Sequence, residues 1–204
     1  MNPNIRNIIF DWGGVLIDVT MDRFIENCKK YGIKLFSSEI TSTHKAGFFQ
    51  EYELGNIGTE DMRNELRQRA SVDLSDSEID RLWNSMIEDI PANKLRLLEN
   101  LKEKYNLFLL SNTNKLHWES ASDSVFRYNG LGKDDFFRNI FLSYEMHLAK
   151  PDSMFFKTAL EKTKLKPDET LFIDDSLINC EAARSLGIHA AHYTIGEDLS
   201  QIFK

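Results

Sequence analysis

The stretch IIFDWGGVLID (residues 8–18) places an apolar run, an acid and two glycines side by side. The apolar run predicts a short buried strand over residues 7–10, which ends at Asp11. Gly13 and Gly14 follow at once, and glycine lets a backbone turn sharply and approach a ligand closely. A carboxylate at the end of a buried strand, beside such a turn, is a candidate for chemistry.

Short apolar runs alternate with segments of helical spacing along much of the remaining chain. Buried strands are expected at residues 7–10, 106–112, 139–143, 171–175 and 189–194. Helices are expected at residues 92–104, 153–163 and 178–186. Strands that alternate with helices predict a parallel sheet with right-handed crossovers. The expected fold class is therefore α/β, with a Rossmann-like parallel sheet flanked by helices.

Residues 16–90 differ in character from the rest of the chain. Apolar residues recur at helical spacing over 21–31, 38–47, 59–70 and 75–89, and no convincing strand pattern occurs among them. Ser75, with Glu78 three residues later, has the spacing of a capping box at a helix start. We therefore expect an all-helical insert over 16–90 and an α/β core made of residues 1–15 and 91–204.

Polar side chains gather where the expected strands end, which is where ligands bind in a sheet of this kind. They are Asp11 after the first strand, Ser111, Asn112, Thr113 and Asn114 after the second, Lys150 after the third, and Asp174 and Asp175 after the fourth. Carboxylates on neighbouring strand ends repel each other, and a hard cation with oxygen ligands, such as Mg²⁺, resolves that repulsion. The carbonyl of Gly13 is a further candidate ligand. Lys150 adds positive charge and Ser111 and Asn112 add donors, so the set suits a tetrahedral dianion.

Composition excludes several classes of protein. A formal net charge of -7 over 204 residues argues against a nucleic-acid binder, which normally shows a basic face. No apolar run approaches the roughly 18 residues needed to cross a bilayer, and the N-terminal stretch is too short and acidic for a signal peptide. Cys28 and Cys180 match neither a zinc pattern nor a disulfide framework. We expect a soluble, cytoplasmic protein, monomeric or weakly homo-oligomeric, that binds no nucleic acid or membrane.

These motifs together resemble the haloacid dehalogenase superfamily along the full length of the chain. That superfamily has a nucleophilic aspartate after its first strand, a serine or threonine after its second, then a lysine, then an acidic pair. The matching stretches here are FDWGGVLID, LLSNTN, AKP and FIDDSLINCEAARSLGI. The insert falls where one class of the superfamily places its cap domain. Within the superfamily, the DWGGV and LSNTN stretches look most like the sugar-phosphate phosphatase branch represented by α-D-glucose-1-phosphate phosphatase.

The resemblance implies a role for each matched residue. Asp11 would attack phosphorus and become an aspartyl phosphate. Mg²⁺ would be held by Asp11, the Gly13 carbonyl and Asp175, with Asp174 either a further ligand or an acceptor for metal-bound water. The implied stabilisers of the developing charge are Ser111, Asn112 and Lys150. The implied function is a Mg²⁺-dependent phosphatase acting on a small phosphorylated substrate, a phosphomonoester expected to be a sugar phosphate such as a hexose 1-phosphate.

One position departs from the common pattern of the superfamily. Most of its phosphatases carry a second aspartate two residues after the nucleophile, which serves as general acid and base, and here that position is Gly13. Asp18, His44 and His117 are the nearest candidates to replace it. In the insert, Phe49, Glu53 and Gly55 fit an F-x-x-x-E-x-G spacing, which leaves substrate contact and insert core equally open.

Two alternatives remain open at the level of sequence. A 2-haloacid dehalogenase also lacks the second aspartate, but it needs no metal and would gain nothing from an acidic pair beside its nucleophile. A binding or regulatory protein that kept the fold and lost turnover would also be consistent with glycine at position 13.

Overall fold

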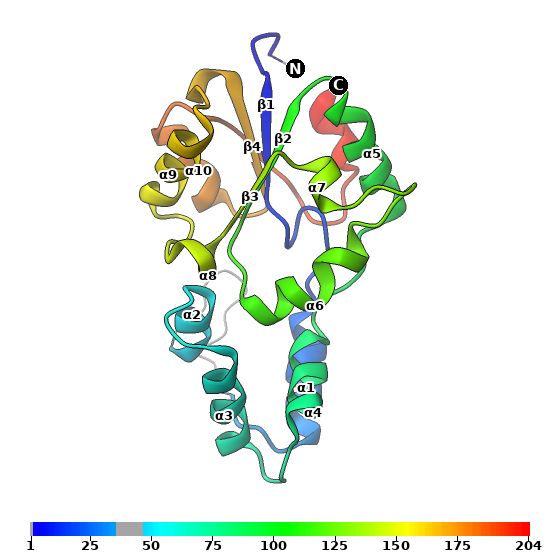
Figure 1. Cartoon of the computed structure of the whole chain (residues 1–204), viewed down its shortest axis with the longest axis vertical. Coiled ribbons are helices and arrows are strands. Elements are labelled where there is room, and N and C mark those ends of the chain that lie inside the picture. Colours follow the sequence, from blue (N-terminus) through cyan, green and yellow to red (C-terminus); the bar gives the residue numbers. More distant parts are fainter. Residues whose placement is uncertain (1, 36–46) are drawn as a thin grey trace.

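The computed structural model describes residues 2–35 and 47–204. It contains a five-stranded sheet in the order β3-β2-β1-β4-β5, in which every neighbouring pair is parallel (Figure 1). The strands are β1 (Asn7–Phe10), β2 (Asn106–Ser111), β3 (Asn139–Leu142), β4 (Thr170–Asp174) and β5 (His189–His192). All five predicted strands are confirmed, and the α/β fold class with them.

β1 is the central strand and all four of its residues are buried. Its side chains alternate between the two faces of the sheet, as strand geometry requires. Ile8 and Phe10 belong to one apolar cluster, whereas Ile9 belongs to the cluster on the opposite face. The uninterrupted apolar run of β1 is thus explained by burial on both faces.

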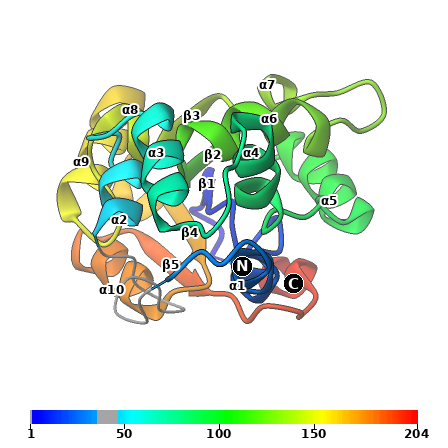
Figure 2. The same cartoon turned by 90° about the horizontal axis from the view of Figure 1, so that it is seen from below.

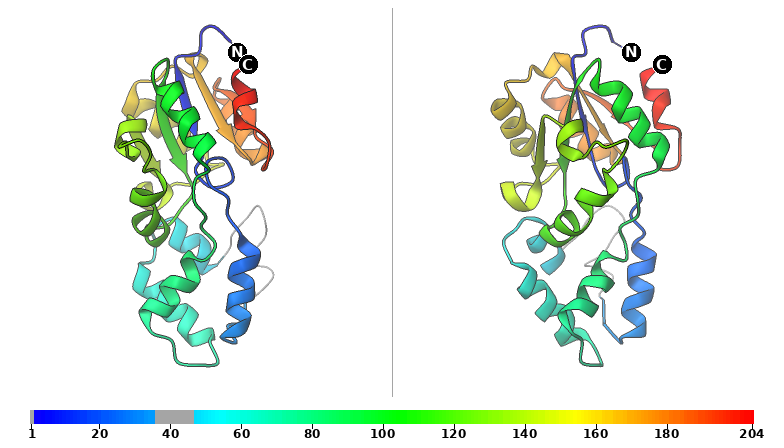
Figure 3. Two further views of the ribbon diagram at one scale, coloured as in Figure 1. Left: turned by 90° about the vertical axis from the view of Figure 1, so that its right-hand side faces the viewer. Right: turned by 45° about the vertical axis from the view of Figure 1, so that its right-hand side comes forward.

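Helices cover both faces of the sheet (Figure 3). One cluster packs side chains of α5 (Ala92–Lys102), α6 (Lys115–Val125), α7 (Lys133–Phe136) and the 3₁₀ segment η2 (Leu199–Phe203) against the sheet. The other packs α9 (Ser153–Thr163) and α10 (Leu177–Ser185). The short helix α8 (Ser143–Met146) follows β3 directly, and η1 (Pro167–Glu169) precedes β4.

The insert lies beyond the carboxyl ends of the strands (Figures 1 and 2). Its helices are α1 (Met21–Lys30), α2 (Phe48–Glu53), α3 (Thr59–Arg69) and α4 (Asp76–Asn84). They share a separate apolar cluster in which Trp83 lies against Phe24, Phe49 and Tyr52 at centroid distances of 5.4 to 5.7 Å. The fold class predicted for this region, a helical insert after the first strand, is confirmed.

Several details of the helices differ from the expectations. The helix expected at 38–47 lies, apart from Gly47, outside the described residues. The helix expected at 75–89 ends at Asn84, although its predicted capping box is present, with the Glu78 carboxylate accepting from the Ser75 N–H at 2.9 Å. Helices α2, α6, α7 and α8 were not expected from the spacing of apolar residues. The boundaries at 16 and 90 stay predictions, and Leu16 packs with the sheet cluster.

Within the described part of the chain, the structure has no helix long and apolar enough to span a membrane. Cys28 and Cys180 are buried free thiols, and burial raises the pKa of each.

Candidate active site

Asp11 directly follows the last residue of the central strand, β1. Its backbone N–H donates to the Ile173 carbonyl at 2.9 Å, so the pairing of β1 with β4 continues one residue past the strand. The Asp11 side chain is turned into the structure, and only 8% of the residue is exposed. Its Oδ1 accepts from the N–H of Trp12 at 2.7 Å. The sheet and this local bond together hold the carboxylate in one orientation.

Lys150 forms ion pairs with two acids, one directly after β1 and one at the end of β4. Its Nζ lies 2.8 Å from Asp11 Oδ1 and 2.8 Å from Asp174 Oδ2. It also donates to the Leu110 carbonyl at 3.0 Å. Burial opposes the charged ammonium, but the two carboxylates outweigh it and raise the pKa of Lys150 above its usual value. The lysine is therefore a fixed cation between two acids.

Asp174 is fully buried and its oxygens are engaged within the protein. Besides Lys150 on Oδ2, its Oδ1 accepts from the N–H of Ser176 at 2.8 Å and from Nδ2 of Asn179 at 2.9 Å. These bonds orient Asp174 toward Lys150. Asn179 thus helps to hold the site in place through its hydrogen bond to Asp174.

Three ionised carboxylates at this place would carry more negative charge than Lys150 balances. Asp11, Asp174 and Asp175 each offer an oxygen within 4.8 Å of the others. Burial raises the pKa of Asp11 to about 8, against the opposing effect of Lys150, and Asp174 and Asp175 raise it further. The pKa of Asp175 is also raised, by burial and then by Asp174. A bound cation would offset this repulsion.

The backbone beside the cluster also fits a metal site. Gly14 has φ +79°, and a Cβ built on it would lie 2.5 Å from Cγ of Asp175. The Asp175 carboxylate therefore occupies the space that a side chain at position 14 would take. An all-oxygen donor set of this kind suits a hard divalent cation, so the residues present fit the predicted Mg²⁺.

Asn112 uses its side chain to bind the backbone of Lys150. Its Nδ2 donates to the Lys150 carbonyl, and its Oδ1 accepts from the Lys150 N–H, each at 2.9 Å. The amide thus clamps the backbone of the lysine, and the predicted contact of Asn112 with phosphate stays a prediction. Ser111, the last residue of β2, is 1% exposed.

The three candidates for the missing acid have different positions. Asp18 is about half exposed, and its Oδ1 lies 3.9 Å from Nζ of Lys94. His117 is buried, and its ring bonds to Asn114 at 3.0 Å and to the Trp83 carbonyl at 3.2 Å, so it is held in the structure on both ring nitrogens. His44 lies outside the described residues.

The position of Gly13 is crowded by a neighbouring side chain. A Cβ at Gly13 would lie 3.1 Å from Cγ2 of Val19. The side chain of Val19 therefore crowds the direction that an acid at position 13 would take.

The F-x-x-x-E-x-G residues of the insert contact protein. Phe49 is 2% exposed and stacks on Trp83, which favours a place in the insert core over substrate contact for that residue. The Glu53 carbonyl accepts from Ser143 Oγ at 2.6 Å. Gly55, with φ +68°, packs against the Tyr144 carbonyl, where a Cβ would come within 2.1 Å of the oxygen.

Ser143 is a site-supporting residue that the sequence reasoning missed. It is fully buried, directly after β3, and bonds to the backbone of Thr113. The signal was present, because Ser143 is a polar residue at the end of a predicted strand, the same feature that pointed to Asp11.

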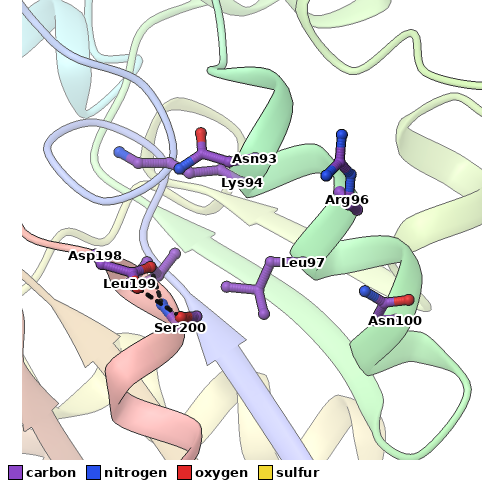
Figure 4. A pocket seen from close by; sticks show the side chains of 8 residues that line it. All are labelled: Asn93, Lys94, Arg96, Leu97, Asn100, Asp198, Leu199 and Ser200. Carbon is purple, nitrogen blue, oxygen red and sulfur yellow. Dashed lines mark hydrogen bonds between the residues drawn. The ribbon is translucent and has the colours of Figure 1, made fainter.

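A cavity of about 230 Å³ lies elsewhere on the molecule, between α5 and η2 (Figure 4). Asn93, Arg96 and Asn100 line it from α5, and Leu199 lines it from η2. Asp11, Lys150 and Asp175 are not among its lining residues, so it is separate from the acidic cluster.

The family model of the haloacid dehalogenase-like hydrolases matches residues 5–187. The chain belongs to this family, as its motifs predicted. It is 29% identical over 197 residues to a D-ribitol-5-phosphate phosphatase of Bacteroides thetaiotaomicron, covering 97% of this chain and 96% of the relative.

Two solved structures are similar over almost the whole chain. A haloacid dehalogenase family enzyme of Bacteroides thetaiotaomicron, in complex with magnesium and inorganic phosphate, has 42% identity and a TM-score of 0.91, and the match covers 98% of this chain and 100% of that one. A HAD-like hydrolase of Porphyromonas gingivalis has 32% identity and a TM-score of 0.88, covering 98% and 96%. These relatives confirm the predicted enzyme class, a phosphatase of the haloacid dehalogenase type. They do not single out the glucose-1-phosphate branch, since the named phosphatase is one for ribitol 5-phosphate.

Proposed function

We propose that the chain is a Mg²⁺-dependent phosphatase that removes phosphate from a small phosphorylated sugar or sugar alcohol by way of an aspartyl phosphate. The observation that carries the proposal is the Asp11 carboxylate, fixed 2.8 Å from a buried lysine and within reach of two further carboxylates. The similarity of almost the whole chain to a D-ribitol-5-phosphate phosphatase supports the same function.

Asp11 is the proposed nucleophile. One of its carboxylate oxygens attacks phosphorus as the bond from phosphorus to the sugar oxygen breaks, and the departing sugar oxygen takes a proton from water. A water molecule then attacks phosphorus and loses a proton to solvent, the bond from phosphorus to the Asp11 oxygen breaks, and phosphate leaves with the Asp11 carboxylate restored. Lys150 stabilises the charge on the phosphoryl oxygens, and Ser111 and the backbone N–H groups of its loop add donors.

Mg²⁺ would be held by Asp11, the Gly13 carbonyl and Asp175, and when bound it supplies positive charge at the phosphoryl oxygens. Asp174 is proposed to position Lys150, because both of its oxygens already accept hydrogen bonds from protein groups. The predicted alternatives, a further metal ligand or an acceptor for metal-bound water, stay open, because Oδ2 accepts a single protein bond and a carboxylate oxygen has two lone pairs.

The identity of the sugar is the finer part of the proposal. The branch resemblance in the sequence points to a hexose 1-phosphate, whereas the named relative is a phosphatase for ribitol 5-phosphate. Helices of the insert lie over the carboxyl ends of the strands, which favours a small substrate over a macromolecule (Figure 2). The predicted cytoplasmic location and monomeric or weakly oligomeric state stay predictions.

The test is phosphate release from a panel that includes ribitol 5-phosphate, glucose 1-phosphate and p-nitrophenyl phosphate. The wild type and Asp11→Asn are each assayed with Mg²⁺ and with EDTA. Release that needs Mg²⁺ and is lost in Asp11→Asn supports the proposal, and the best substrate names the sugar.

Two other results would replace the proposal. Chloride release from 2-chloropropionate in EDTA would establish the dehalogenase alternative. Binding of inorganic phosphate without turnover of any phosphomonoester would establish the binding protein, with Gly13 as its cause.

A further inference from the structure

The loop of residues 112–114, which follows β2, makes hydrogen bonds in two opposite directions. Toward the active site, Asn112 clamps the backbone N–H and carbonyl of Lys150. Lys150 in turn holds Asp11 and Asp174. The position of Asn112 therefore determines where Lys150 lies relative to Asp11.

Toward the insert, the same loop is bonded through Ser143. Ser143 Oγ accepts from the Thr113 N–H at 2.9 Å, and its own hydroxyl proton is shared between the carbonyls of Glu53 at 2.6 Å and Thr113 at 2.9 Å. Glu53 belongs to α2 of the insert. One fully buried hydroxyl thus joins the insert to the residue that follows Asn112.

Asn114 makes a second connection from this loop to the insert. Its Oδ1 accepts from Nε1 of Trp83 at 3.2 Å and from the His117 N–H at 3.1 Å, while its Nδ2 lies 3.0 Å from Nδ1 of His117. His117 Nε2 lies 3.2 Å from the Trp83 carbonyl, which can only accept, so Nε2 is the donor and Nδ1 the acceptor. Trp83 is the centre of the insert cluster.

The contact around Ser143 is close as well as polar. Gly55 approaches the Tyr144 carbonyl so closely that no side chain fits between them. His147 Nδ1 lies 2.9 Å from the Leu54 carbonyl. Residues 53–55 therefore pack against α8 and His147, and a shift of the insert at this point would break these contacts together.

We propose that Ser143 and Asn114 are positioning residues that couple the placement of the helical insert to the catalytic lysine. The route runs from Glu53 and Trp83 in the insert, through Thr113 and Asn114, to Asn112 and Lys150. The reaction that this coupling would serve rests on the proposed function, but the coupling itself is a property of the hydrogen bonds.

The test uses Ser143→Ala in the full chain, with Ser122→Ala as the matched control, because Ser122 is another buried serine, on α6. Asn114→Ser is the second variant, since serine keeps the helix N-cap but is too short to reach Trp83. The first readout is hydrogen exchange of the Lys150 backbone N–H, measured by NMR. That N–H is bonded to Asn112, so neither variant alters its bond directly.

Exchange of the Lys150 N–H is expected to speed up by about tenfold or more in Ser143→Ala and Asn114→Ser, and to be unchanged in Ser122→Ala. Faster exchange confined to Thr113 and the α6 N-terminus, with Lys150 unchanged, would overturn the proposal. This readout needs no turnover, so it decides the coupling even if no phosphomonoester proves to be a substrate.

The second readout separates positioning from stability and from substrate contact. kcat/KM is expected to fall by about tenfold for both the best sugar phosphate and p-nitrophenyl phosphate, because a displaced Lys150 affects phosphoryl transfer itself. A fall for the sugar phosphate alone would show that these residues serve substrate recognition instead. Unchanged kcat/KM with a lower Tm would show a purely structural role.

Discussion

Lys150 Nζ lies 2.8 Å from Oδ2 of Asp174, and the two side chains are 1% and 0% exposed. Burying an ion pair this deeply carries a large desolvation cost, which the attraction between the two charges offsets. Removing one partner therefore leaves the other charge buried without compensation. Here the uncompensated charge would be the negative charge of the surrounding carboxylates.

Lys150→Met should therefore lower the free energy of unfolding by about 3–5 kcal/mol in the absence of metal, as measured by urea denaturation in EDTA. Lys157→Met is the control, because Lys157 is exposed on α9, and it should stay within about 0.5 kcal/mol of the wild type. A Lys150→Met protein as stable as the control would mean that the carboxylates are not charged together in the folded chain.

Asp175→Asn should weaken the stabilisation of the fold by Mg²⁺. In the wild type, Mg²⁺ at about a hundred times its Kd should raise the free energy of unfolding by ~2.7 kcal/mol. At the same Mg²⁺ concentration the variant should gain much less, since it has lost a charged ligand, while Asp168→Asn on exposed η1 should gain as much as the wild type. Thermal unfolding across a Mg²⁺ titration makes the comparison, and equal gains in both variants would remove Asp175 from the ligand set.

Gly14→Ala and Gly130→Ala form a matched pair of backbone substitutions. The two glycines have φ of +79° and +80°, so alanine pays a similar conformational cost at each, on the order of 1 kcal/mol. At Gly130 a Cβ meets nothing within 4 Å, whereas at Gly14 it meets the Asp175 carboxylate at 2.5 Å. Only Gly14→Ala should lose Mg²⁺ binding, as measured by calorimetry. Wild-type Mg²⁺ affinity in Gly14→Ala would show that the Asp175 side chain moves aside freely.

Glycine at position 13 should make the rate sensitive to the leaving group. A general acid typically contributes about 10²–10⁴-fold to such a reaction, and it matters most when the departing oxygen is basic. For a series of aryl phosphates, kcat/KM under single-turnover conditions should fall steadily as the pKa of the phenol rises. A flat series would mean that another group donates the proton to the leaving oxygen.

The sheet and the four strand-end motifs could be predicted because each depends on residues adjacent in sequence. An apolar run such as Ile8 to Phe10 predicts a strand by itself, and parallel strands place their carboxyl ends at one edge. The sequence also placed Asp11, Lys150, Asp174 and Asp175 at that edge, where the structure brings them together.

The supporting bonds could not be predicted because they join residues far apart in the chain. Trp83 and Asn114 are 31 residues apart, and Ser143 and the Glu53 carbonyl are 90 apart. No spacing rule links such positions. His117 is the instructive case. A histidine near a motif is a reasonable candidate acid from sequence, whereas in the structure one ring nitrogen bonds to Asn114 and the other to the Trp83 carbonyl of the insert.

The central place of β1 has a consequence for the chain as it is being made. Ile8 pairs with Leu107 on one side and with Leu171 on the other, so both neighbours of the first strand are synthesised long after it. Contacts this distant in sequence form late in folding. Asp11 emerges from the ribosome early, but it meets Lys150 and Asp175 only once β4 has been added. A chain that terminates before residue 150 therefore carries the proposed nucleophile without Lys150 and Asp175, and we expect it to be inactive.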